Sequence, residues 1–434
     1  MTRSYRHNSA AILLFIIGLL SQTQINIGGK LGISEFCMIV CAPFVFCRCY
    51  KMLWNDKVLY FFWLIILWLG GAVFVDLYTH NIIPFMLRGI AVPITVFANC
   101  VCIYVLLRKD YDSLKWFLLG TALSSVISIF IFQQGLAGDL AAEYGMEAGI
   151  ERMVSYKLFW VNQVTTWLTL PIIGWYLKIP KVYSLGAMLV ICIFDIATGG
   201  RAAFLGATFA LLLVLMGGRS RNSMLRIKHH IVAMLIVSVV VAVGTKYVYK
   251  YMIEQGYMNE TEEKKYERQT AMGSSLLNLL MAGRSETFIG LIAALDKPII
   301  GHGSVAIDDH GYVLDYFSQY GSLAEYLHLE ESRQKFGARI IPAHSHLVNY
   351  WMWHGVFALI FWLSVFYLAI RTLLFRMHVY PGWYGYFAVM IPPFLWDLFF
   401  SPFGLRVLKC TMFVAFLLVA KLERDQKKGI APIM

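Results

Sequence analysis

Two histidines stand at the start of a long apolar segment, where one of them could act as a base. The stretch "IPAHSHLVNYWMWHGVFALIF" (residues 341–361) runs from Pro342 through His344 and His346 into this segment. Pro342 suits the first turn of a helix, which would put His344 near a positively polarised N-terminus and lower its pKa. A neutral imidazole can take a proton from a hydroxyl group near neutral pH. We therefore expect His344 to be a general base, with a simple capping role at the membrane interface as the alternative.

The two histidines cannot both face one site if they lie on a helix. Residues i and i+2 point about 200° apart around a helix, so only one of the two imidazoles can look into a cavity. His344 shares a face with Gly355, about three turns later, where a glycine would let another helix approach closely. We expect packing roles for His346 and His354, and keep His346 as the reserve candidate for the base.

Two arginines stand where other helices are expected to begin. Arg201 follows two glycines in "TGGRAAFLGA", and Arg284 follows one in "AGRSETFIG". A helix N-terminus offers unpaired N–H groups, and a guanidinium adds a bidentate fork, so each corner suits a phosphate. Together they predict two forks on one pyrophosphate. The alternatives are a snorkelling role at the interface for Arg201 and a surface salt bridge to Glu286 for Arg284.

A metal site is the rival source of positive charge. In "AIDDHGY", Asp308, Asp309 and His310 are oxygen and nitrogen ligands at close spacing and could hold a cation. We favour a solvated turn for this stretch.

The composition places the chain in a bilayer. Of its 434 residues, 59% are hydrophobic and 15% charged, far from the balance of a soluble domain. The net charge of +11 is typical of cytoplasmic loops that face anionic lipid, so we discard nucleic-acid binding. The eight cysteines lie in or beside apolar segments and imply no disulfide framework.

Stretches of about 17 to 25 apolar residues mark the expected membrane crossings. Twelve are found, at about 9–27, 34–49, 58–76, 84–107, 113–133, 158–177, 182–198, 202–217, 231–249, 346–370, 381–399 and 405–420. Lys and Arg collect in alternate loops, which predicts a multi-pass protein with both termini cytoplasmic.

We expect three parts: helices one to nine in residues 1–249, an extracytoplasmic loop over 250–343, and helices ten to twelve with a cytoplasmic tail in 344–434. The loop is too long for a simple connector. Within it, Phe288, Ile292 and Leu295 have helical spacing, which predicts an amphipathic helix that lies on the membrane body and ends at Pro298.

Three stretches resemble the bacterial O-antigen ligase and O-antigen polymerase family. In "GRSETFIGLIAALDKPIIGHGSVAI" an arginine precedes a helix and a P-x-x-G-x-G turn follows; in "AHSHLVNYWMWHGVFALIF" a glycine lies eleven residues after a histidine; "GGRAAFLGATFALLL" is similar to the upstream arginine block. The family's histidine is usually followed by Asn, whereas Ser345 and a second histidine stand here, which leaves the choice between His344 and His346 open. His302, in the turn, is a further reserve candidate.

The resemblance implies an all-α membrane glycosyltransferase of the GT-C type in the bacterial inner (plasma) membrane. Its donor would be a glycan on undecaprenyl pyrophosphate, used on the periplasmic side with inversion and without a metal or other cofactor. His344 would be the base, and Arg201 and Arg284 would bind the pyrophosphate. The acceptor would be the lipid A core for a ligase, which we favour, or another lipid-linked repeat unit for a polymerase of O-antigen or exopolysaccharide.

A polysaccharide transporter or flippase is the hypothesis from another class. It predicts charged residues within several crossings and pseudo-symmetric halves. Intramembrane ionisable residues are sparse here, with Asp195 and Asp397 the clearest, and we find no convincing internal repeat.

Overall fold

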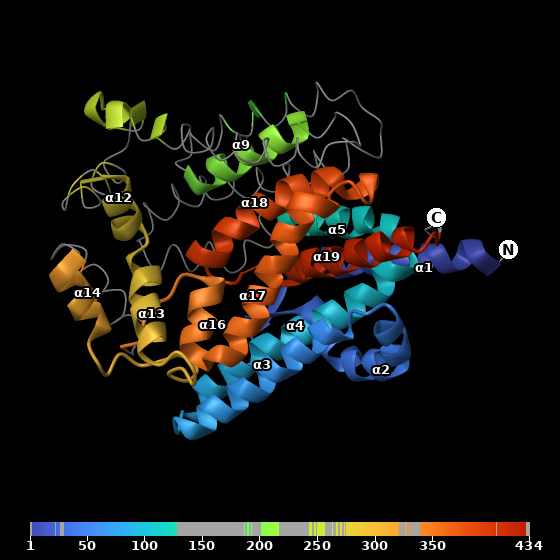
Figure 1. Cartoon of the computed structure of the whole chain (residues 1–434), viewed down its shortest axis with the longest axis horizontal. Helices are drawn as coiled ribbons and strands as arrows, with labels where there is room; N and C mark the ends of the chain where they lie inside the picture. The colour runs from blue at the N-terminus through green and yellow to red at the C-terminus, as the bar shows by residue number, and fades with distance from the viewer. Residues whose placement is uncertain are drawn as a thin grey trace.

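The structure, a computed structural model, describes residues 2–21, 23–26, 30–127, 201–216, 250–256, 275–320, 339–404 and 406–430, with isolated residues in the intervals between 186 and 330. These parts are helical apart from one short hairpin (Figure 1). The longer elements are α1 (Thr2–Leu19), β1 (Gln24–Asn26), β2 (Lys30–Gly32), α2 (Ile33–Asn55), α3 (Leu59–Tyr78), α4 (Ile83–Lys109), α5 (Leu114–Ile127), α9 (Arg201–Met216), α12 (Leu276–Gly283), α13 (Ser285–Asp296), α14 (Tyr312–Tyr320), α16 (His346–His354), α17 (Val356–Arg371), α18 (Tyr384–Phe400) and α19 (Arg406–Lys427). Short turns of 3₁₀ or π helix lie at Tyr111–Ser113, Thr372–Arg376 and Pro381–Trp383.

Four helical stretches of the described chain are long and apolar enough to cross a membrane: Ile33–Asn55, Leu59–Tyr78, Ile83–Lys109 and His346–Arg376. The chain is thus an all-α membrane protein in the part that is described. The crossings expected over 158–177, 182–198 and 231–249 lie almost wholly outside the described residues. The number twelve and the GT-C type of fold stay predictions.

The first expected crossing, 9–27, is wrong in its second half. Its helix ends at Leu19, and β1 then pairs antiparallel with β2, with Ile25 opposite Leu31. The helix ends close to the polar Ser21, whose hydroxyl donates a hydrogen bond to the carbonyl oxygen of Gly18 over 2.7 Å. Such a bond from a serine side chain competes with the bonds that would continue the helix.

Ionic contacts at two opposite ends show the directions of the helices. At one end, Arg108 of α4 pairs with Asp56 after α2, and Arg424 of α19 donates to the Asp56 carbonyl. At the other end, Arg406 at the start of α19 makes a bidentate pair with Glu35 at the start of α2. These three helices therefore run the same way, as the predicted alternation of crossings requires.

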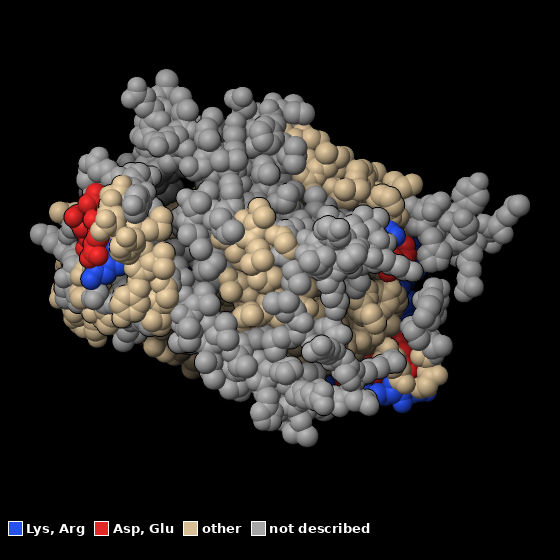
Figure 2. All heavy atoms as spheres, turned by 90° about the horizontal axis from the view of Figure 1, so that it is seen from above, with Lys and Arg blue, Asp and Glu red and all other residues tan. Residues whose placement is uncertain are grey.

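Charge on the surface follows the same division. On the face in Figure 2, the described acidic and basic side chains that can be seen lie toward the two ends of the molecule. Charged side chains are costly in the hydrocarbon core of a bilayer and are expected at its two surfaces.

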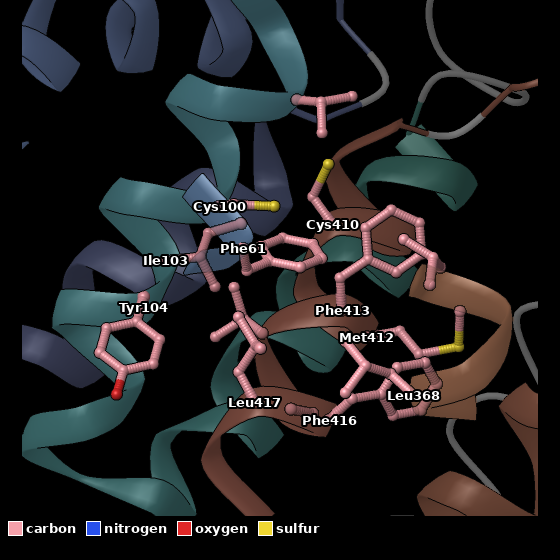
Figure 3. Packing of buried hydrophobic residues seen from close by; sticks show 14 of the residues in the cluster. Phe61, Cys100, Ile103, Tyr104, Leu368, Cys410, Met412, Phe413, Phe416 and Leu417 are labelled. Atoms are coloured by element: carbon pink, nitrogen blue, oxygen red, sulfur yellow. The ribbon is translucent and has the colours of Figure 1, made fainter. Parts of the chain in front are cut away.

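The core between the two ends is apolar and rich in aromatic rings. Where α4 meets α19, Cys100 and Ile103 face Cys410 and Phe413 (Figure 3). This packing fixes α19, and so fixes the position of the residues at its N-terminal end.

The tenth expected crossing is not one helix. Gly355 has φ +61° and ψ −145°, which ends α16 and starts α17 at a sharp bend. The rings of His346 and Trp362 lie 5.5 Å apart, whereas 16 residues of straight helix would separate them by about 24 Å. The helix α16 therefore folds back against α17 (Figure 1).

Gly355 does allow a close approach, but not of another helix. A Cβ at this position would lie 2.0 Å from the carbonyl oxygen of Ile299, in the turn that follows α13. The amide of Val356 donates to the same carbonyl over 3.0 Å. The glycine thus allows the P-x-x-G-x-G turn to pack directly against the bend between α16 and α17.

The amphipathic helix expected near residue 288 is confirmed as α13, which ends at Asp296 just before Pro298. The expected packing face is wrong. Ile292 and Leu295 are 40% and 58% exposed, and the small residues Gly290 and Ala293 lie on the buried face instead. Small side chains let α13 lie close to the segment before α16, where a Cβ on Gly290 would meet Ala343 Cβ at 2.6 Å.

Candidate active site

The C-terminal turn of α18 organises the residues that the sequence singles out. The last carbonyls of a helix have no partner within it and accept hydrogen bonds from elsewhere. Here three such carbonyls each receive one side chain: Ser345 Oγ donates to Leu398 O (2.9 Å), Arg284 Nη1 to Phe400 O (2.8 Å) and His346 Nδ1 to Ser401 O (2.6 Å). One helix end therefore positions the segments around both Arg284 and His344.

Arg284 lies at the junction of α12 and α13 and is partly buried. Its guanidinium carbon lies 5.5 Å from the centroid of the Trp396 ring, a cation–π distance. Burial lowers the pKa of Arg284, and the nearby Asp397 carboxylate opposes that effect. Arginine stays charged in proteins, so the site contains a fixed positive charge.

His344 precedes the helix rather than opening it. Ser345 is the N-cap of α16, with Val348 N donating to its hydroxyl over 3.0 Å. The His344 side chain is 52% exposed, and its Nδ1 contacts the carboxylate of Glu286. Its main-chain oxygen accepts a hydrogen bond from Thr287 Oγ1 over 3.0 Å. The imidazole is thus held at Nδ1 by Glu286, while about half of the side chain remains exposed.

Burial, and then the charge of Arg284, lowers the pKa of His344. Both causes disfavour the imidazolium and so favour the neutral form that a base requires. A salt bridge between Arg284 and Glu286 was the alternative considered for Arg284; in the described structure Glu286 contacts His344 instead.

His346, the reserve candidate, is fully buried, with 0% exposure. Its Nδ1 bonds to Ser401 O, and its Nε2 receives Lys409 Nζ over 2.6 Å. Lys409 in turn pairs with Asp397 over 3.2 Å. Because both ring nitrogens are occupied, His346 holds α16 against α18 and α19 and has no lone pair to offer a substrate.

His302, the other reserve candidate, lies in the turn after α13. Its Nε2 bonds to Ala293 O over 2.8 Å, and its amide donates to Met352 O. Burial lowers its pKa. The residue fastens the turn to α13 and α16, and makes no contact with His344 in the described structure.

The acidic stretch after this turn has a structural role. Both carboxylate oxygens of Asp308 accept amide hydrogens at the start of α14, from Tyr312 (2.8 Å) and Val313 (3.3 Å). Among the described residues, no group of three or more His, Cys, Asp and Glu side chains is arranged to hold a metal ion.

Arg201 is the first residue of α9, and its side chain lies outside the described structure. The helix packs antiparallel to α18: a Cβ on Gly206 would lie 3.0 Å from Pro393 Cγ, and Tyr384 OH donates to Leu213 O over 2.7 Å. This register directs the start of α9 toward the end of α18 that holds Arg284 (Figure 1).

A family model described as O-antigen ligase matches residues 186–363. These residues are thus similar to the O-antigen ligase family, as the sequence motifs predict. No curated protein matches the sequence. The matched range contains Arg201, Arg284 and His344.

Some site residues of this O-antigen ligase region were not expected from the sequence. Glu286 was considered only as a partner for Arg284, although its place in the first turn of α13 could have marked it as a helix-end acid. Trp396 and the carbonyls of α18 lie beyond the matched range. Main-chain acceptors carry no side-chain signal, so only the fold could reveal them.

Proposed function

We propose that the chain is an O-antigen ligase-type glycosyltransferase. It moves a glycan from undecaprenyl pyrophosphate to a hydroxyl on the lipid A core, at the periplasmic side of the bacterial inner membrane. The observation that carries the proposal is the half-exposed imidazole of His344 beside the guanidinium of Arg284, within the region that matches the O-antigen ligase family.

The proposed reaction is a direct displacement at the anomeric carbon of the donor's first sugar. His344 takes the proton of the acceptor hydroxyl as its oxygen bonds to this carbon. The bond to the pyrophosphate oxygen breaks on the opposite face, so the configuration inverts. The products are the extended acceptor and undecaprenyl pyrophosphate, and His344 releases its proton to water.

In this proposal Arg284 and Arg201 stabilise the negative charge that grows on the leaving pyrophosphate. Arg284 is suited to this role because the Phe400 carbonyl and the Trp396 ring hold its guanidinium before substrate binds. A preorganised charge in a partly buried site loses less energy to reorganisation than one in water. The two arginines supply the positive charge that a divalent cation supplies in other enzymes.

The alternative is a polymerase that joins lipid-linked repeat units of O-antigen or exopolysaccharide. Both activities need the same donor site and differ only in the acceptor. The family match does not separate the two activities. The preference for a ligase is part of the proposal.

Transfer by the purified protein in lipid nanodiscs tests the proposal. A glycan on undecaprenyl pyrophosphate is supplied with core lipid A, or alone, and products are separated by mass. A glycan joined to core lipid A supports the ligase, and elongation without lipid A supports the polymerase. His344→Ala should abolish either product, whereas the exposed His310→Ala should not. Full activity of His344→Ala would remove the base assignment.

A further inference from the structure

Two neighbouring residues of α13 hold His344 by its ring and by its main chain. The Glu286 carboxylate contacts Nδ1 of the imidazole, and the Thr287 hydroxyl donates to the His344 carbonyl over 3.0 Å. This double contact fixes the ring relative to α13 although His344 lies in an extended segment before α16. A half-exposed side chain outside a helix would otherwise sample several rotamers.

The contact determines which ring nitrogen carries the proton. An ionised carboxylate can only accept hydrogen bonds, so the hydrogen of a neutral imidazole sits on Nδ1. The lone pair is then on Nε2. No described residue bonds to Nε2, and the side chain is 52% exposed. Nε2 is therefore the ring nitrogen that can take a proton, on a side chain that is half exposed.

The charges near His344 divide into those that oppose the imidazolium and one that favours it. Arg284, at the junction of α12 and α13, opposes it. Lys409 of α19 contacts His346 rather than His344, and its charge is paired with Asp397 of α18. Glu286 is the carboxylate in direct contact with the ring, and the N-terminal end of α13 favours its ionised form.

We infer that Glu286 is a positioning residue for His344: its carboxylate fixes the proton on Nδ1, aims Nε2 at the acceptor hydroxyl, and stabilises the imidazolium that forms when Nε2 takes the proton. The inference rests on the proposed function, because it assigns a role in the same proton transfer. Glu286 neither touches the donor nor binds the proton itself. The negative charge also balances Arg284, which the pyrophosphate would neutralise on binding.

Steady-state transfer by Glu286→Gln tests the inference. The glutamine keeps the shape and an oxygen for Nδ1–H but removes the charge. We expect kcat to fall about 10- to 100-fold, part of the 10²- to 10⁴-fold that general base catalysis supplies, with little change in KM for the donor. The acidic limb of the pH profile should move to lower pH, because without the carboxylate the imidazolium is less stable. Glu286→Asp, which keeps the charge, should restore the position of the limb.

The matched control is Asp315→Asn, which removes an exposed acid from α14 in the same loop. It should leave kcat and the limb unchanged. A fall in rate that is equal at every pH for Glu286→Gln would mean a packing role only, and would overturn the inference. His344→Ala separates this outcome from failure of the proposed function: if it is inactive while Glu286→Gln keeps the wild-type profile, only the role of Glu286 is lost.

A second measurement does not depend on turnover. Diethyl pyrocarbonate modifies neutral imidazole, and peptide mass spectrometry follows the modification of His344 alone as a function of pH. The midpoint for His344 should move to lower pH in Glu286→Gln, and the exposed His310 in the same sample serves as the internal standard for the amount of reagent. An unmoved His344 midpoint would contradict the proposed stabilisation even if the variant were inactive.

Discussion

Arg284 Nη1 donates to the carbonyl oxygen of Phe400 over 2.8 Å and so ties the junction of α12 and α13 to the end of α18. The two residues are 116 positions apart in the sequence. A hydrogen bond from a charged donor contributes about 1.5–3 kcal/mol. This bond has two effects: it anchors the long loop on the helix bundle, and it orients a guanidinium toward the segment that holds His344.

Arg284→Lys should impair transfer although the positive charge is kept. An ammonium cannot make the bond to Phe400 O and at the same time present a bidentate fork to phosphate. We expect kcat/KM to fall at least about 10-fold, which corresponds to about 1.4 kcal/mol. The control is Arg371→Lys, an arginine at the end of α17 that bonds to Tyr367 OH. Wild-type rates for Arg284→Lys would show that the guanidinium never contacts the pyrophosphate.

The pH dependence of His344 should respond to Arg284 with the opposite sign from Glu286. The guanidinium lowers the pKa of His344, so the neutral base persists below the ordinary histidine pKa of about 6.5. Arg284→Gln removes the positive charge, and the pKa of His344 should rise. Diethyl pyrocarbonate modification of His344 should then reach its midpoint at higher pH than in the wild type. An unchanged midpoint would mean that burial alone sets the pKa.

Gly355→Ala should destabilise the protein strongly. The φ of +61° with ψ near −145° is close to a region used almost only by glycine, and the new Cβ would overlap the Ile299 carbonyl. Such backbone strain costs about 1–3 kcal/mol before the overlap is counted. Gly70→Ala in α3 is the control, because nothing lies within 4 Å of its Cβ position. Thermal unfolding in detergent should show a clear loss for the first variant and none for the second.

Much of the bundle could be predicted from apolar length and basic loops. The crossings expected at 34–49, 58–76 and 84–107 correspond to α2, α3 and α4, because long apolar runs bounded by Lys and Arg have few alternatives in a bilayer. The bend at Gly355 could not be predicted in this way. Residues 346–370 contain no Asp, Glu, Lys or Arg, and a single glycine is common inside membrane helices.

Within the site, residue types were more predictable than partners. A histidine and an arginine beside helix starts carry a chemical signal, and the structure brings Arg284 and His344 to the same end of α18. Their roles stay predictions. Glu286 was weighed only as an alternative partner for Arg284, because sequence proximity suggested the nearest cation. The packing of α13 on the segment before α16 places Glu286 next to His344 instead.

Asp76→Ala should destabilise the protein, because it removes the hydrogen bonds that hold the turn after α13. The Asp76 carboxylate is 1% exposed and accepts from Ser304 N (2.6 Å), Ser304 Oγ (2.7 Å) and Asn81 Nδ2 (3.0 Å). Its loss leaves buried donors without a partner and should cost about 3 kcal/mol or more. Ser304→Ala should cost less, because the charged acceptor keeps its bond to Asn81. The exposed Ser318→Ala is the control, and equal unfolding temperatures for all three variants would contradict this prediction.

Transfer should survive removal of divalent cations, because in the proposed mechanism arginines carry the positive charge. Activity in excess EDTA should equal that of the untreated protein. Asp308→Ala separates structure from metal binding: both its carboxylate oxygens cap α14, so the variant should unfold at lower temperature. Its activity per folded molecule should remain, with or without added Mg²⁺, Mn²⁺ or Ca²⁺. The contrary outcome would be that EDTA abolishes activity and that one of these ions restores it in the wild type but not in Asp308→Ala. The positive charge would then come from a cation bound at Asp308 and Asp309.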